Sequence, residues 1–344
     1  MKPRDLRLLI MHVSTRCDQT CAHCSIWKSN GNTGGELGVA ARLAIIDEAR
    51  SLGARAILFT GGEPLLCDHL ETLARAARGF GLSVQIATNG LGLSLSSSWL
   101  TEVVSEVYVS LEGPEDIHDG VRGPRMFSRL KASLAGIRSR PGRPRLIGRS
   151  VISARNAAVL GETVLAARSL RLDAVSFLPV DTTSYAFGGD PAARGSLRPG
   201  PTEVAELRRE IARLGISGAL GTFVLEDEQK LARIADGFLS EASSRIVPAC
   251  NAPEWSSVVE ADGVIRPCFF QPGVVASQGV SLGAVRRSVE YAAALGRLGE
   301  GDRICADCVC PKHVATGVAS LRGRVGAVLA RALPQSAPRA GSAA

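Results

Sequence analysis

The sequence lacks any apolar segment long enough to cross a membrane, and the hydrophobic stretch near its N-terminus, Leu8–Val13, is too short for the core of a signal peptide. We therefore predict a cytoplasmic protein with no membrane partner. A reducing compartment argues against a disulfide framework. The nine cysteines are instead expected to bind metal or to serve redox chemistry.

Blocks of like charge are also missing, and lysine is scarce. The 40 basic residues exceed the 33 acidic ones by a formal net charge of +7, and nearly all of them are arginine. The charges are scattered, and aromatic residues make up only 4% of the chain, so no aromatic stripe lies among them. We predict no nucleic-acid partner, whereas an acidic or phosphorylated substrate remains open.

Short β-rich runs alternate with amphipathic helical patterns over the first half of the chain. The predicted strands are Arg7–Val13, Ala56–Thr60, Val84–Thr88, Val107–Leu111, Leu146–Ile152 and Ala174–Leu178, and the predicted helices include Ala40–Leu52, Asp68–Phe80, Phe127–Arg138 and Leu160–Leu170. This alternation predicts an α/β fold with a parallel sheet and right-handed crossovers. Six units are too few to close an eight-stranded barrel, so we expect a partial (β/α)6 barrel with its chemistry at the C-terminal ends of the strands.

The rest of the chain divides by composition. A Gly-, Pro- and Ser-rich segment, Asp181–Pro201, predicts a long loop that contacts substrate through Tyr185, Phe187 and Arg198. We place the barrel core at 1–200, a helical connection at 201–245 with helices Thr202–Leu214 and Glu226–Phe238, and a small cysteine-rich α+β module at 246–313. Residues 314–344 are predicted to form a helix, Val314–Leu333, followed by a disordered tail.

Three cysteines follow the first predicted strand in one loop. Cys17, Cys21 and Cys24 have the spacing C-x3-C-x2-C, which lets three thiolates bind three irons of one cubane and leaves the fourth iron open for a chelating ligand. Ordinary ferredoxin clusters take four cysteines. Zinc is the alternative, with His23 as a further ligand, but structural zinc sites normally show paired C-x2-C units or histidine partners.

With these motifs the chain resembles the radical S-adenosylmethionine (SAM) superfamily over residues 6–180. The resemblance implies that the triplet holds a 4Fe–4S cluster and that His23, in the position before the last cysteine, packs near the adenine. It also implies that the loop Gly61-Gly62-Glu63-Pro64 binds the SAM amino group. Glycines let the backbone approach the ligand, and Glu63 can accept from an ammonium.

Later strand ends also resemble those of the family. The resemblance implies contacts to SAM or substrate from Thr88, Asn89, Ser110 and Glu112, although the family more often has Asp where Glu112 stands. Arg122 is expected to pair with the SAM carboxylate, or else to be a solvated turn arginine. On the fifth strand Ser150 is the expected ribose contact and Arg149 the alternative carboxylate partner, because neighbouring residues face opposite sides. Leu178 is expected to cover the adenine or to be a core leucine.

Five more cysteines lie between residues 250 and 310. Cys250 and Cys268 flank a hairpin with an Asp262-Gly263 turn, and Cys305-x2-Cys308-x-Cys310 follows. Four thiolates suit either a cluster or zinc. The arrangement resembles the SPASM and shortened "twitch" modules of radical SAM enzymes. It implies one auxiliary 4Fe–4S cluster on Cys250, Cys268, Cys305 and Cys308, with Cys310 spare or replacing Cys308.

The resemblance implies an enzyme that forms a 5′-deoxyadenosyl radical from SAM and removes a hydrogen atom from a small-molecule or peptide substrate. Our leading expectation is net oxidation of a sugar, aminocyclitol or other natural-product intermediate, with the auxiliary cluster as electron acceptor and a flavodoxin- or ferredoxin-type reductant. The first strand begins within ten residues of Met1, so we expect no N-terminal peptide-recognition domain.

Three alternatives stay open. A maturase of ribosomal peptides would place the chemistry on a peptide. An epimerase would use Cys310 or Cys67 as hydrogen donor, although Cys67 also suits a buried small hydrophobe. A non-catalytic iron–sulfur electron carrier would explain two clusters but not the SAM-type loop.

Overall fold

A computed structural model describes residues 6–29, 35–184, 186–188, 191–239, 252–274, 281–296 and 308. Cys250, Cys305, Cys310 and Tyr185 lie outside the described residues, as do the helix predicted at 314–333 and the tail after it. The strands are β1 Leu8–Ser14, β2 Ala56–Gly61, β3 Ser83–Thr88, β4 Glu106–Ser110, β5 Arg145–Ile152, β6 Ala174–Pro179, β7 Ser256–Val259 and β8 Ile265–Arg266.

Helices alternate with these strands. The α-helices are α1 Val39–Ser51, α2 Leu70–Gly79, α3 Ser97–Val103, α4 Glu115–Arg122, α5 Met126–Arg138, α6 Leu160–Ser169, α7 Pro201–Ile216, α8 Glu228–Leu239, α9 Ala252–Trp255, α10 Leu282–Arg287 and α11 Val289–Gly296. Short 3-10 turns are η1 Ile26–Ser29, η2 Pro64–Leu66 and η3 Pro191–Leu197.

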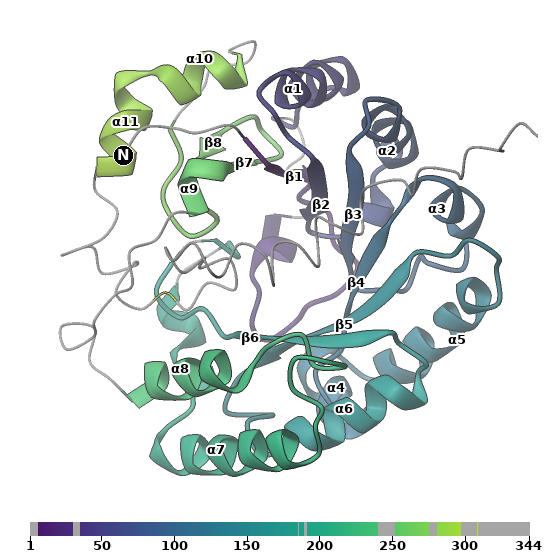
Figure 1. The fold of residues 1–344 in the computed structure, drawn as a ribbon, viewed down its shortest axis with the longest axis vertical. Coiled ribbons are helices and arrows are strands. Elements are labelled where there is room, and N and C mark those ends of the chain that lie inside the picture. Colours follow the sequence, from purple (N-terminus) through teal and green to yellow (C-terminus); the bar gives the residue numbers. More distant parts are fainter. Residues whose placement is uncertain are drawn as a thin grey trace, which may run out of the picture.

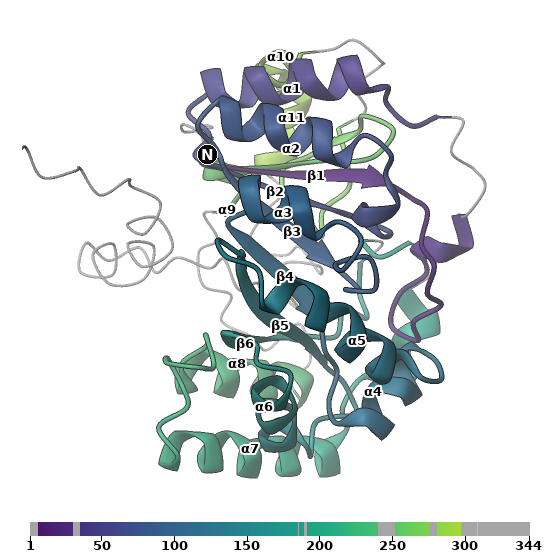
Figure 2. The same cartoon turned by 90° about the vertical axis from the view of Figure 1, so that its right-hand side faces the viewer.

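All described strands belong to one sheet, in the order β6-β5-β4-β3-β2-β1-β7-β8. Neighbours from β6 to β7 run parallel, and only β8 is antiparallel to β7. The sheet curves into an open ring with the α-helices outside (Figure 1). Seen from the side, β1 points towards the edge where the segment carrying η1 and helix α4 lie (Figure 2). The fold is therefore a partial barrel, and the predicted class is confirmed.

Two faces of the sheet differ in chemistry because side chains alternate along each strand. Leu9, Met11 and Val13 of β1 pack with Phe59 of β2 in the hydrophobic core beneath the helices. The residues between them, Leu8, Ile10, His12 and Ser14, point to the other face, which we call the inner face. Along β4 and β5 the inner face is mostly polar, with Glu106 opposite Arg145, Tyr108 opposite Ile147 and Ser110 opposite Arg149.

The hairpin that was predicted between Cys250 and Cys268 forms, and it joins the main sheet. Strand β7 pairs in parallel with β1, with Met11 opposite Val259, and turns back into β8. Gly263 adopts φ +92° at the turn, and the side chain of Asp262 accepts from Val264 N at 3.0 Å. The hairpin therefore extends the barrel sheet, and the domain limits at 200, 245 and 313 stay predictions.

A single carboxylate attaches helix α10 to the barrel. Glu48 of α1 accepts from Leu282 N at 2.7 Å and Gly283 N at 2.8 Å, and it also contacts the Ser281 hydroxyl. These amides begin α10 and would otherwise lack helical partners. The contact joins residues more than 230 positions apart in the sequence.

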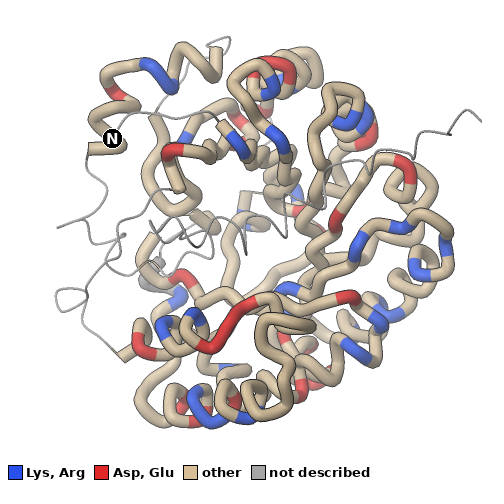
Figure 3. The backbone as a smooth tube through the Cα atoms, viewed as in Figure 1, with Lys and Arg blue, Asp and Glu red and all other residues tan. Residues whose placement is uncertain are grey.

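All six strands predicted in the first half are confirmed, and every strand end lies within one residue of its predicted position. The helices predicted there and at 202–214 and 226–238 are confirmed as well. Helices α3, α4, α9, α10 and α11 were not predicted, because each is short. Acidic and basic residues are intermixed along the outer helices (Figure 3). In the described part of the chain, no helix has the length and apolar character needed to span a membrane.

Candidate active site

The three N-terminal cysteines lie in the loop between β1 and η1. Cys21 is buried, and Cys17 and Cys24 are half-buried reduced thiols. Burial raises the pKa of Cys17 to about 12 and also raises those of Cys21 and Cys24. Within the described ranges, no three Cys, His, Asp or Glu side chains form a ready site for a single metal ion. A cubane separates its ligands more widely than one ion does, because each thiolate binds a different iron. An all-thiol donor set spread along one loop therefore fits a cluster better than zinc.

The glycine loop after β2 lies directly on this cysteine loop. Gly62 N donates to Ser14 O at 2.8 Å, and Glu63 N donates to Arg16 O at 2.7 Å. A Cβ on Gly61, which has φ +130°, would lie 2.3 Å from Ser14 O, and one on Gly62 would lie 2.2 Å from Arg16 O. The glycines are required for the close approach of these two loops, a reason that sequence analysis did not find.

Glu63 ties the same loop to the end of β3. Its carboxylate accepts from the Thr88 hydroxyl at 2.7 Å, Asn89 N at 2.7 Å and Leu65 N at 2.9 Å. Burial raises the pKa of Glu63 to about 7 despite these donors. Asn89 in turn donates through Nδ2 to Asp18 at 2.6 Å, beside Cys17. Three predicted cofactor residues, Glu63, Thr88 and Asn89, are thus brought together around the cysteine loop.

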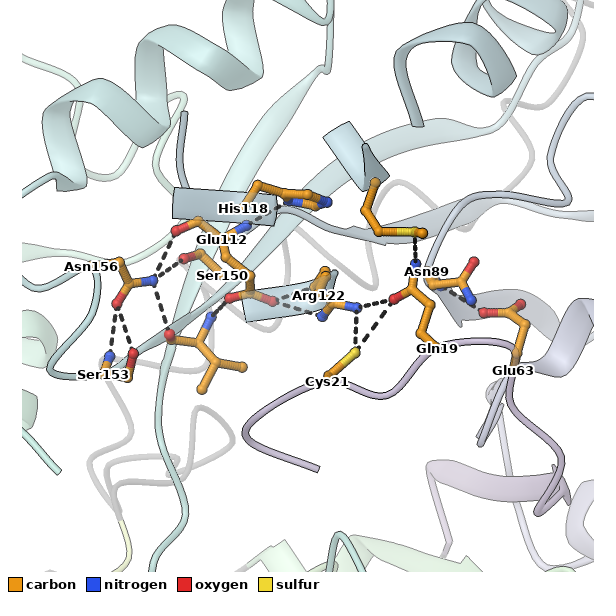
Figure 4. Close-up of polar contacts among 12 residues, drawn as sticks. Gln19, Cys21, Glu63, Asn89, Glu112, His118, Arg122, Ser150, Ser153 and Asn156 are labelled. Atoms are coloured by element: carbon orange, nitrogen blue, oxygen red, sulfur yellow. Dashed lines mark hydrogen bonds and ion pairs between the residues drawn. The ribbon is translucent and has the colours of Figure 1, made fainter. Parts of the chain in front are cut away.

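Arg122 links Cys21 to the end of β4 (Figure 4). Its Nε and Nη2 donate to Glu112 Oε1 at 2.9 and 2.6 Å, and its Nη1 donates to Gln19 Oε1 at 3.0 Å and Cys21 Sγ at 3.5 Å. Glu112 is fully buried and also accepts from Val151 N at 2.9 Å. Burial opposes its ionisation, but the Arg122 guanidinium, with further donors, holds its pKa below the usual range. The predicted pairing of Arg122 with a SAM carboxylate stays a prediction, and here the guanidinium binds Glu112.

Ser150 lies on the helix-covered face, not the inner face. Strand β5 places it opposite Phe177 of the core, and Asn156 Nδ2 contacts its hydroxyl at 3.3 Å (Figure 4). Asn156 also donates to Glu112 O at 2.9 Å and accepts from Ser153 N at 2.8 Å. Ser150 is thus part of the support beneath Glu112.

Arg149 takes the inner face at this level. Its guanidinium stacks over the Tyr108 ring at 4.1 Å, and its buried Nε has no hydrogen-bond partner. Ser110 and Leu178 are partly exposed on the same face of β4 and β6. Of the two candidates on β5, the structure makes Arg149 the better placed to meet a ligand inside the barrel.

The segment after β6 lies against the cysteine loop. Phe187 O accepts from Ser25 N at 2.8 Å and faces Cys24 Sγ at 3.7 Å. Buried Arg194 holds the segment by donating to Ser184 O at 2.5 Å. His23 lies half-buried nearby, and burial lowers its pKa to about 4. Arg198 instead donates to Gly237 O of α8 at 2.8 Å, so its guanidinium is bound to that helix.

The remaining predicted cysteines are only partly described. Cys268 and Cys308 are half-buried, and Phe270 N donates to Cys268 Sγ at 3.4 Å. Cys67 is half-buried and accepts from Arg42 Nη1 at 3.7 Å, beside Pro64 of the glycine loop. Cys250, Cys305 and Cys310 lie outside the described residues, so the auxiliary cluster and the hydrogen-donor thiol stay predictions.

Four polar residues of this region were not predicted from the sequence: Gln19, Asn156, His12 and Glu260. His12 could have been found from the sequence, because it alternates with the core residues Met11 and Val13 along β1 and therefore points to the inner face. Nothing local marks Glu260, because its place depends on β7 pairing with β1.

Together the fold and the site define an open α/β barrel in which a three-cysteine loop and a glycine loop meet at the C-terminal edge of the sheet. A family model of the Radical SAM superfamily matches residues 11–141. Curated relatives include Fe-coproporphyrin III synthase of Methanosarcina barkeri, 34% identical over 38% of this chain and 33% of that protein. Another is the pre-heme d1 synthase of Dinoroseobacter shibae, 30% identical over 38% of this chain and 33% of its own length. The matches thus span about a third of the length of these relatives.

Solved structures agree on the fold. anSMEcpe with bound AdoMet and a Cp18Cys peptide aligns with a TM-score of 0.62 at 16% identity, covering 95% of this chain and 98% of that one. Streptococcus suis SuiB bound to S-adenosylmethionine gives a TM-score of 0.59 at 15% identity, covering 91% and 71%. Over residues 11–141 the chain is thus similar to the radical SAM superfamily. Two of the solved structures of similar fold contain bound S-adenosylmethionine.

Proposed function

We propose that Cys17, Cys21 and Cys24 hold the 4Fe–4S cluster and that SAM binds between this loop and the Gly61–Pro64 loop. When bound, these cofactors supply a 5′-deoxyadenosyl radical that removes a hydrogen atom from the substrate. The observation that carries the proposal is the pair of backbone hydrogen bonds joining the two loops, Gly62 N to Ser14 O and Glu63 N to Arg16 O.

The chain's own residues would prepare this site. Glu112 fixes Arg122, whose Nη1 reaches Cys21 Sγ, so a positive charge stands beside a thiolate ligand. Glu63 holds the ends of β2 and β3 together. Arg149, on the inner face over Tyr108, is a candidate partner for the SAM carboxylate or for an anionic group of the substrate.

We infer a polar substrate and net oxidation of it. Towards the C-terminal ends of β4 and β5 the inner face carries Ser110 opposite Arg149, which suits a hydroxyl-bearing compound such as a sugar or aminocyclitol. The curated relatives match only 38% of this chain, so their names say little about this substrate.

Peptide modification is the second candidate. Two structures of similar fold were solved with peptides, SuiB with its precursor SuiA and anSMEcpe with a cysteine peptide. Epimerisation through Cys67 or Cys310 is a variant of either candidate. Both candidates use the same first step, so they differ only in what reaches the inner face.

The test begins with anaerobic reconstitution, dithionite and SAM. The wild-type enzyme should form 5′-deoxyadenosine, and Cys21→Ala should form none. A perdeuterated cell extract of the source organism, separated into small metabolites and peptides, is then added. Deuterium entering 5′-deoxyadenosine identifies the fraction that holds the substrate. Absence of 5′-deoxyadenosine in every sample would refute the proposed function.

We further propose an auxiliary 4Fe–4S cluster on Cys250, Cys268, Cys305 and Cys308, with the cluster accepting the electron of the oxidised substrate. Wild-type enzyme should hold about eight irons and Cys305→Ala about four, because each such cluster binds four irons. The variant should keep SAM cleavage and lose product. Unchanged product formation would exclude the electron-accepting role, and one zinc per chain would favour a structural zinc site.

A further inference from the structure

His12 has one ring nitrogen that no group in the described part of the chain satisfies. The side chain belongs to the inner face of β1, five positions before Cys17, and is 6% exposed. Its Nδ1 lies 3.0 Å from Glu260 Oε2, whereas its buried Nε2 has no hydrogen-bond partner. Buried polar atoms are nearly always paired, so an unpaired one at a binding face indicates a partner from outside.

Glu260 determines which nitrogen carries the proton. The pairing of β7 with β1 sets it beside His12, and Arg266 pairs with its other oxygen at 2.6 Å. Burial opposes the charge of Glu260, but His12 and Arg266 together lower its pKa, so it is ionised. An ionised carboxylate accepts a hydrogen bond, so a neutral His12 holds its hydrogen on Nδ1 and leaves a lone pair on Nε2.

Two aromatic rings connect His12 with the cysteine loop. The His12 ring lies 5.6 Å from the Phe269 ring, which lies 5.3 Å from the Phe187 ring. The carbonyl of Phe187 in turn faces Cys24 Sγ at 3.7 Å. The unpaired nitrogen thus stands on the same side of the barrel as the proposed cluster, beside two apolar rings.

We propose that His12 Nε2 binds the substrate by accepting a hydrogen bond from an O–H or N–H group adjacent to the carbon that loses its hydrogen atom. The inference deepens the proposed function and rests on it, since it takes the inner face as the substrate site. Glu260 and Arg266 are positioning residues that keep the imidazole in the accepting tautomer. The substrate class is then one with a hydroxyl, amine or amide donor next to the reacting carbon.

The tautomer is tested by NMR on reconstituted enzyme with 15N-labelled histidine, and His12→Gln assigns the signal. We expect Nδ1 protonated and Nε2 bare at neutral pH, and Glu260→Gln should shift the proton towards Nε2. A wild-type Nε2–H, or an unchanged ratio in Glu260→Gln, would overturn the proposal. This readout does not depend on SAM cleavage, so it separates failure of this inference from failure of the proposed function.

Access to Nε2 is tested with diethyl pyrocarbonate, which acylates bare imidazole nitrogens. The chain provides two references, exposed His69 and buried His118. His12 should react roughly tenfold faster than His118, because a closed core protects a side chain from reagents. A rate equal to that of His118 would mean that no substrate group reaches Nε2, which would also overturn the proposal.

Matched variants then separate a binding role from a structural one. Asn places its amide near Nδ1 and can still donate to Glu260, whereas Gln places a carbonyl near Nε2. For both variants, 5′-deoxyadenosine formed from SAM alone is measured first, and deuterium transfer is expressed relative to it. With the deuterated fraction, His12→Asn should lose transfer and His12→Gln should keep more of it. Equal transfer in wild type and His12→Asn would count against the proposal.

Discussion

At the scale of single residues, close backbone approach explains the glycine loop. Gly61 and Gly62 were predicted to contact the ligand, and the structure shows that they first have to fit against Ser14 and Arg16. The glycine positions were therefore recognisable from the sequence, but their physical reason was not, because it depends on a loop 45 residues away in the chain.

Replacing Gly62 should disturb the cysteine loop. In Gly62→Ala the new methyl group would lie 2.2 Å from Arg16 O, which forces a backbone shift costing about 1–3 kcal/mol of unfolding free energy. We expect a lower urea midpoint and weaker SAM cleavage. Gly79→Ala is the control, because nothing lies within 4 Å of its Cβ and it ends helix α2. Equal midpoints for both variants would contradict the packing argument.

His118 should make stability depend on pH. It is buried and accepts from Glu112 N through Nδ1 at 3.3 Å; burial, then Arg122, lowers its pKa from 6.5 to about 4. Between these values the unfolded chain binds more protons than the folded one. Stability should therefore fall as the pH drops from 6.5 to about 4, by about 3 kcal/mol for this group.

The matched variant is His118→Asn, whose Oδ1 can accept the same hydrogen bond without titrating. Urea unfolding of both proteins from pH 7 to pH 4 isolates the contribution of His118 in their difference. Parallel stability curves over this range would show that His118 does not titrate as its burial implies.

At the scale of elements, strand positions could be predicted and strand partners could not. Alternating apolar residues predict the positions of β1 to β6. The alternation shows that Arg149 and Ser150 face opposite sides, but it does not show which of them faces inward. That choice depends on which side the helices cover. The Glu112–Arg122 pair was likewise hidden, since α4 is a short helix whose position follows from packing against α5 and the cysteine loop.

Helix α10 gives a prediction at this scale. Removing the carboxylate in Glu48→Gln should weaken the α10 cap by about 1 kcal/mol, as loss of a helix cap does. Faster amide exchange should appear in Leu282–Arg287 and not in β2 or β3. Asp47→Asn on the same helix removes only an exposed pair with Arg50 and should change nothing. Exchange that rises evenly over the whole chain would show that Glu48 acts on global stability instead.

At the scale of the whole molecule, the barrel and the cysteine-bearing C-terminal part share one sheet. The sequence predicted a separate small module after residue 245, and the hairpin of that module is confirmed. Its first strand, β7, nevertheless pairs with β1 and is the seventh strand of the parallel part of the sheet. A four-residue strand carries too little local signal to name its partner. Only the assembled sheet shows that both parts line the same inner face.

This shared sheet predicts how the two cysteine groups separate in function. Cys24→Ala should abolish SAM cleavage, whereas Cys268→Ala should leave it and stop later steps, because Cys268 lies beyond the β7–β8 hairpin and not in the first loop. Anaerobic assays of 5′-deoxyadenosine and of substrate-derived product measure the two effects. Loss of both activities in Cys268→Ala, with β1 still folded, would contradict the division.

The parallel contact between β7 and β1 also matters to anyone who wishes to engineer this enzyme. Grafting a foreign C-terminal segment from residue 252 onward would replace the neighbour of His12 as well as the later cysteines. The hybrid protein should then show the substrate preference of the protein that supplied the grafted segment, even when every residue proposed to form the radical is left unchanged. Exchanging parts of this protein would therefore alter what it recognises before it altered the chemistry that it starts.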